Sequence, residues 1–141
     1  MAPTEIPPLA SSNRRILPIW TDGLLALGAG AVGGEVLGRT VNYWAAAVGT
    51  LLLVSFCNHV ILTASAGGSI GKIISGLRLI RISDLGKPSI GQAIRRWLWG
   101  FFYILISPVL ILSGSDVDHL DVADLRIVRN ADLRGSGADP L

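Results

Sequence analysis

Three long stretches of this chain are almost free of charge, and they constrain its fold more than any other feature of the sequence. They cover residues 16–37, 42–65 and 95–113. A bilayer core about 30 Å thick takes roughly 20 apolar residues of helix to cross. The chain is 50% hydrophobic and only 16% charged, which is too apolar for a soluble protein. The sequence therefore predicts an all-α membrane protein with about three transmembrane helices.

The first stretch contains a carboxylate, Asp22, seven residues after Arg15. An ionisable side chain inside a membrane span is costly, so it marks a candidate functional site by default. The alternative is that Asp22 lies just below the lipid headgroups, within reach of Arg14 and Arg15. Both interpretations are open at this point.

The second stretch carries no formal charge between Arg39 and Lys72, but it has a polar island at Asn58 and His59. If its helix ends near residue 66, His59 lies about 10 Å inside the span, and Asp22 lies at a similar depth. Two antiparallel helices would then place Asp22 beside Asn58 or His59, which would satisfy the carboxylate. The histidine itself is either a packed, hydrogen-bonded residue or a proton relay.

Small residues fill the second half of the first stretch. Gly30, Gly34 and Gly38 follow one another at four-residue spacing, which favours close approach of a neighbouring helix along this face. Glycines also occur in membrane helices without such a partner. Near the start of the same stretch we place Pro18 in the first helical turn, where a proline has no hydrogen bond to lose.

The loop of residues 66–96 is glycine-rich and basic, with six Lys or Arg residues against one acid. Lys and Arg near span ends favour the cytoplasmic side, and Arg14 and Arg15 place the N-terminus on that side too. Anionic lipid headgroups would hold the loop near the membrane surface. Two crossings between the N-terminus and this loop are consistent with both assignments.

The stretch around Gly71 and Lys72 resembles a phosphate-binding loop only superficially. The required first glycine is Ala66, and the hydroxyl residue after the lysine is Ile73. No nucleophile, base and orienting acid occur at a shared depth beyond the pair Asp22 and His59. We therefore expect no enzyme activity, no cofactor, no metal site and no nucleic-acid partner.

The third stretch carries Pro108 near its middle and has two interpretations. A single crossing would put the C-terminal tail outside, whereas a segment broken by proline can dip into the membrane and return. Residues 77–82 and 125–130 share an order of apolar and basic residues that is typical of short β-strands. They can pair only if both lie on the same side. The alternative is a chance match, so three crossings are the default expectation.

Several segments together resemble the RDD family of small bacterial multi-pass membrane proteins. Residues 14–22 resemble its opening arginine and aspartate, residues 69–80 its glycine-lysine signature, and residues 86–96 its polar turn with a basic approach to the last span. His119 and Asp121 resemble its last motif, although Val122 stands where that motif has a basic residue. The resemblance implies the signature residues Arg15, Asp22, Gly71, Lys72, Gly76 and Asp121. It also implies a membrane domain over 14–130 between flexible segments 1–13 and 131–141.

The resemblance implies an architecture more firmly than an activity, because the role of the family is mostly unassigned. Transport has been proposed for it, including sodium/proton exchange for some members. We expect a protein of the bacterial inner (cell) membrane with a cytoplasmic N-terminus. One hypothesis is an accessory, scaffold or assembly subunit that binds other membrane proteins or itself. The other is an ion or solute transporter, which would have to be a homo-oligomer because three short spans cannot enclose a pathway.

Overall fold

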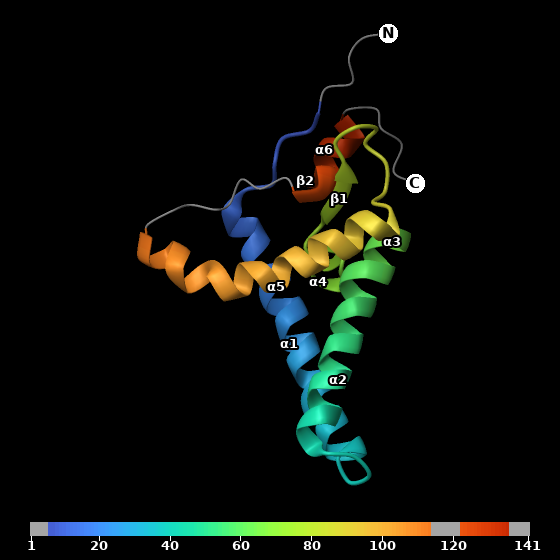
Figure 1. Cartoon of the computed structure of the whole chain (residues 1–141). Coiled ribbons are helices and arrows are strands. Elements are labelled where there is room, and N and C mark those ends of the chain that lie inside the picture. The colour runs from blue at the N-terminus through green and yellow to red at the C-terminus, as the bar shows by residue number, and fades with distance from the viewer. Residues whose placement is uncertain (1–5, 114–121, 136–141) are drawn as a thin grey trace.

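A computed structural model describes residues 6–113 and 122–135. Two antiparallel helices form a long hairpin, and a small sheet with short helices covers one end of it (Figure 1). The elements are α1 (Ser12–Leu37), α2 (Tyr43–Phe56), the π-helix η1 (Cys57–Ile61), α3 (Leu62–Ala66), α4 (Ile70–Ile74), β1 (Leu77–Arg81), α5 (Ile90–Ser113), the 3₁₀ turn η2 (Val122–Asp124), β2 (Leu125–Arg129) and α6 (Asn130–Gly135).

The hairpin contains two helices that are long and apolar enough to cross a membrane, Asn13–Leu37 and Tyr43–Ala66. The second runs through α2, η1 and α3 without interruption. Asn42 begins it, because its side-chain oxygen accepts hydrogen bonds from the N–H groups of Trp44 and Ala45. These two helices coincide with the first two apolar stretches to within three residues at each end.

Three glycines of α1, at positions 30, 33 and 34, lie against α2. A Cβ atom at Gly30 would lie 3.0 Å from the carbonyl oxygen of Ala47, and one at Gly34 would lie 2.8 Å from the Tyr43 ring. Gly38 likewise faces Tyr43. The predicted packing face is therefore used inside the chain. Gly33, which the sequence analysis did not single out, is packed against Thr50 most closely of all.

Pro18 was wrongly placed in the first turn of the helix. The helix begins at Ser12, so the proline lies in its interior and leaves the carbonyl of Arg14 without the usual partner. Prolines in membrane helices are tolerated where neighbouring groups compensate for the lost bond. Here α4 packs closely against this turn, since a Cβ atom on Gly71 would touch the backbone of Pro18.

Strands β1 and β2 pair antiparallel, with Leu77 opposite Arg129 and Arg81 opposite Leu125. This confirms the pairing predicted from their similar sequences. Ile80, Val128 and Leu133 form the core beneath the sheet. Ala10 is also buried, and its N–H donates to the carbonyl of Ile127. Ala10 thus bonds to β2, and Leu133 of α6 packs in the core.

Helix α5 runs across the end of the hairpin rather than alongside it (Figure 1). It packs on η1 and α3, and Trp97 of α5 donates from Nε1 to Ser55 Oγ at 3.1 Å. Because β1 precedes α5 and β2 follows it, the intervening chain leaves the sheet and returns to it. The third crossing expected over 95–113 is therefore not shown, and the fold is mostly helical with one small sheet rather than all-α.

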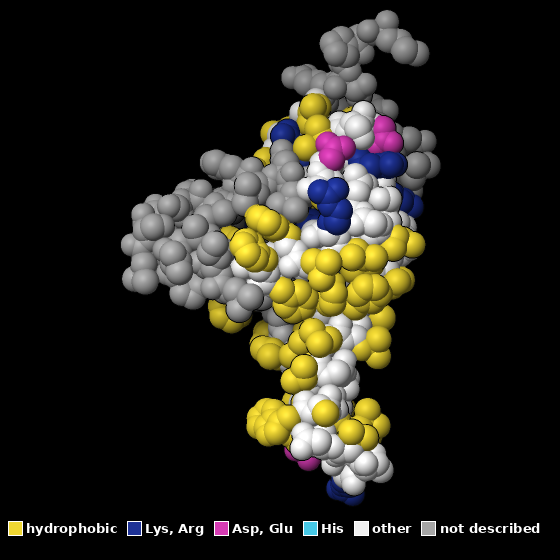
Figure 2. Space-filling model, in the orientation of Figure 1, with side chains coloured by type: hydrophobic (Ala, Val, Ile, Leu, Met, Phe, Trp, Pro, Cys, Tyr) yellow, Lys and Arg dark blue, Asp and Glu magenta, His cyan; other side chains and the backbone are white. Residues whose placement is uncertain are grey.

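The surface divides into an apolar part and a basic part (Figure 2). Large apolar side chains on the hairpin are exposed, among them Trp20 at 66%, Trp44 at 72% and Leu27 at 62%. Lys and Arg side chains gather around the sheet, at the opposite end from the turn between α1 and α2. Exposed apolar surface of this extent marks a membrane or interaction surface. Together with the two long helices, it indicates a membrane location.

The packing of the hairpin predicts the effect of enlarging its glycines. Gly30→Leu should push α2 away, because the new side chain meets the Ala47 backbone and Leu51, and it should cost about 1–3 kcal/mol of unfolding free energy. Gly23→Leu on the same helix is the control, since nothing lies within 4 Å of its Cβ position. Reversible unfolding in mixed micelles measures both. Equal destabilisation by the two variants would contradict the packing described here.

Candidate functional site

Asp22 is buried at the centre of a hydrogen-bond network that joins three segments of the chain. Its Oδ1 accepts from Asn58 Nδ2 and from the Gly71 N–H, each at 2.8 Å. Its Oδ2 accepts from Ser69 Oγ at 2.6 Å. The side chain is only 5% exposed. The carboxylate thus has three donors within the protein, which offsets the cost of its burial.

Asp22 and Asn58 together cap the short helix α4. Asn58 Oδ1 accepts from the Ile70 N–H at 2.8 Å, and Asp22 accepts from the next N–H along. The first N–H groups of a helix have no partner within it, and in most helices the residue at the N-cap supplies one. Here the N-cap residue, Ser69, directs its hydroxyl to Asp22 instead. Two side chains from the membrane helices therefore fix α4 against the hairpin.

Gly71 and Gly76 have separate structural reasons to be glycine. A Cβ atom at Gly71 would lie 2.6 Å from the carbonyl oxygen of Pro18 and 3.0 Å from the Asp22 carboxyl carbon. Any side chain there would therefore separate α4 from α1. Gly76 adopts a φ of 66°, a left-handed conformation that glycine reaches without strain, as the chain leaves α4 for β1.

Lys72 extends the network away from Asp22. Its Nζ donates to Ser69 Oγ at 3.0 Å, so the ammonium reaches the carboxylate through one hydroxyl group. Burial lowers the pKa of Lys72 to about 8; the positive charge of Arg96 acts in the same direction, and Asp22 opposes it. At neutral pH the ammonium is still mostly protonated.

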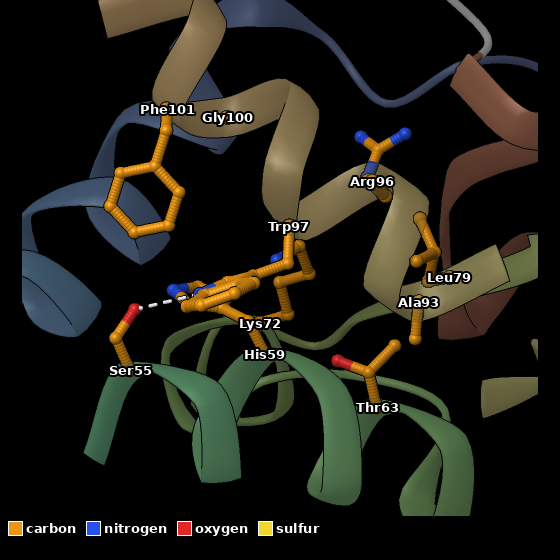
Figure 3. Close-up of a pocket in the computed structure, with 10 residues that line it drawn as sticks. All are labelled: Ser55, His59, Thr63, Lys72, Leu79, Ala93, Arg96, Trp97, Gly100 and Phe101. Carbon is orange, nitrogen blue, oxygen red and sulfur yellow. Dashed lines mark hydrogen bonds between the residues drawn. The ribbon is translucent and has the colours of Figure 1, made fainter. Parts of the chain in front are cut away.

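A cavity of about 220 Å³ lies on the other side of Lys72, between the second membrane helix and α5 (Figure 3). Its lining residues are Ser55, His59, Thr63, Lys72, Leu79, Ala93, Arg96, Trp97, Gly100 and Phe101. The structure thus places His59 in this cavity, and Asn58, not His59, is the hydrogen-bond partner of Asp22. Of the two partners predicted for Asp22, Asn58 and His59, only Asn58 forms the hydrogen bond.

The polar island of the second span coincides with the π-helix η1, which the sequence analysis did not predict. Within this wider turn, Asn58 and Val60 are buried, and the neighbouring Cys57 is exposed. Single π-turns inside α-helices are frequent at functional sites. No composition signal marks them, so only the polar pair Asn58 and His59 indicated this position.

The expected signature also includes Arg15 and Asp121. Arg15 is partly buried on α1, two helical turns before Asp22. Asp121 and His119 lie outside the described residues. The sequence analysis did not single out Ser69, whose hydroxyl joins Asp22 to Lys72 in the structure.

The network predicts a graded loss of stability at position 22. Asp22→Ala should leave three buried donors without an acceptor and cost about 3 kcal/mol of unfolding free energy. Asp22→Asn keeps one acceptor oxygen and should cost about half as much. Unfolding in mixed micelles measures both variants. Glu35→Ala removes an exposed carboxylate from the same helix and should change stability little. A loss no greater for Asp22→Ala than for Glu35→Ala would refute the structural importance of the network.

Comparison with known proteins gives one result that bears on this arrangement. The model of the RDD family matches residues 9–116, which include both helices of the hairpin, α4 and β1. No curated protein and no solved structure matches the chain. Since the family match spans most of the 141 residues and contains the Asp22 network, this chain belongs to the RDD family.

Proposed function

We propose that this protein is a small integral membrane protein that serves as an accessory, scaffold or assembly subunit of a larger membrane complex. One observation carries the proposal: the Asp22 carboxylate accepts three hydrogen bonds from within the chain, donated by Asn58, Ser69 and Gly71. A transport pathway needs polar groups that face a passage through the membrane. Here the buried carboxylate instead fixes one end of a hairpin and the elements packed on it.

A groove along the hairpin supports the proposal, because it offers a place for a partner helix. It is lined by small and branched residues of α1, with Thr50 of α2 at its edge: Leu24, Leu25, Gly28, Ala29, Val32, Gly33, Val36, Leu37 and Thr50. Nothing lies within 4 Å of the Cβ position of Gly28. Small residues allow membrane helices to approach closely. The expected partner is a transmembrane helix of another membrane protein or of a second copy of this chain.

We also propose an orientation in the bacterial inner membrane. Basic side chains gather at the end of the hairpin that carries the sheet (Figure 2). The opposite end has Arg39 and Glu35 beside the turn. The bias in Lys and Arg favours the cytoplasm for the sheet end and for the start of α1. Because β1 and β2 pair, this orientation places β2 on the cytoplasmic side as well.

Transport by a homo-oligomer is the second candidate, and one observation favours it. Asp22, Ser69 and Lys72 form a continuous series of hydrogen bonds that ends at the cavity where His59 lies. Such a series is able to carry a proton between titratable groups. Sodium or proton flux in proteoliposomes that is lost in Asp22→Asn would favour this candidate over the accessory role.

The accessory role is tested by blocking the groove. Gly28→Leu should abolish recovery of the native complex after gentle solubilisation, because the new side chain fills the space left for a partner helix. Gly49→Leu on α2 is the matched control, since its Cβ position is equally open and lies outside the groove. Native gels followed by identification of co-purified chains provide the measurement. A wild-type protein that runs as a lone monomer, or a complex unaffected by Gly28→Leu, would rule out this role for the groove.

A further inference from the structure

The cavity between η1 and α5 has one polar wall and one aromatic wall. Lys72, His59 and Thr63 come from α4, η1 and α3, while Trp97 and Phe101 come from α5 (Figure 3). Trp97 is held in place by its hydrogen bond to Ser55 and by edge-on contact with Phe101, their ring centroids lying 4.8 Å apart. Donors on one side and apolar surface on the other are the arrangement of a ligand site.

The unused N–H donors of Lys72 favour an anionic ligand. An ammonium group has three N–H donors, and within the described part of the chain Lys72 uses one of them, on Ser69. An anion in the cavity would supply acceptors for the remaining donors.

The size of the cavity limits what the anion can be. At about 220 Å³ the cavity is smaller than the roughly 300–1,000 Å³ typical of sites for drug-sized ligands. It therefore suits a headgroup-sized ligand. A tetrahedral group with several acceptor oxygens matches donors that arrive from three separate elements, and lysine commonly binds phosphate as a point charge. The aromatic wall suits the carbon atoms attached to such a group.

We propose that this cavity binds the phosphate group of a phosphate ester, with Lys72 as the charged contact and His59 and Thr63 as neutral hydrogen-bonding groups. A phospholipid headgroup at the membrane surface and a small soluble phosphate ester present the same chemistry. The site does not depend on the accessory role, since it lies on the α5 side of the hairpin and the groove lies on α1.

Binding by the full-length protein in neutral detergent tests the proposal and separates the two sources. Three probes are titrated by calorimetry: dihexanoyl phosphatidylglycerol, dihexanoyl phosphatidylcholine and glycerol 1-phosphate. Binding of phosphatidylglycerol at least tenfold tighter than that of the other two identifies an anionic lipid as the ligand. Glycerol 1-phosphate binding as tightly as phosphatidylglycerol identifies a small phosphate ester. Binding of none of the three overturns the proposal.

Two pairs of variants locate the site. Lys72→Gln should weaken binding at least tenfold, whereas Arg95→Gln, which removes an exposed charge of α5 outside the cavity, should change it less than twofold. Equal losses in this pair would mean that only general surface charge attracts the probe, and would overturn the proposal.

The second pair leaves every charge in place, so it remains informative if Lys72→Gln does not fold. Gly100 lines the cavity and its Cβ position is open, so Gly100→Leu should fill the space and weaken binding at least tenfold. Gly91→Leu places the same side chain at an equally open position on α5 outside the cavity, and binding should be retained. Binding that is unchanged in Gly100→Leu excludes this cavity as the site.

Discussion

Asp22 accepts hydrogen bonds from both the second membrane helix and the segment that follows it, and the arrangement of the sheet end depends on this one carboxylate. A helix of five residues such as α4 does not hold together by its own hydrogen bonds. Asp22 and Asn58 supply the acceptors that its first N–H groups need. The cost of burying this charge is thereby offset by the charge-assisted bonds that fix α4 on α1.

The position of α4 determines what lies beyond it. Gly76 turns the chain out of α4 into β1, and its carbonyl accepts from the N–H of Asn130, where β2 ends. The cavity depends on the same placement, because Lys72 belongs to α4 and the opposite wall belongs to α5. A polar cluster inside the hairpin thus organises the basic end of the protein. This link is the physical basis of the proposed accessory role.

The sequence predicted the features that follow from long or repeated patterns. Two long apolar helices followed from uncharged stretches, and the strand pair followed from two similar apolar and basic segments. Equal depth in antiparallel helices predicted that Asp22 contacts Asn58 or His59, and the structure shows the contact with Asn58. Features that depend on distant contacts were missed. Helix α4 is too short to show a period, the π-helix has no compositional signal, and the course of α5 across the hairpin follows from the strand pair rather than from its own apolar length.

Amide hydrogen exchange at Ile70 and Gly71 tests the central claim most directly, because these are the two N–H groups that Asn58 and Asp22 cap. The account predicts that in Asp22→Ala both amides exchange at least tenfold faster, a change of about 1.4 kcal/mol in local opening, while amides of α2 keep their protection. Glu35→Ala serves as the comparison protein. Unchanged protection of Ile70 and Gly71 in Asp22→Ala would contradict the claim that this carboxylate holds α4 in place.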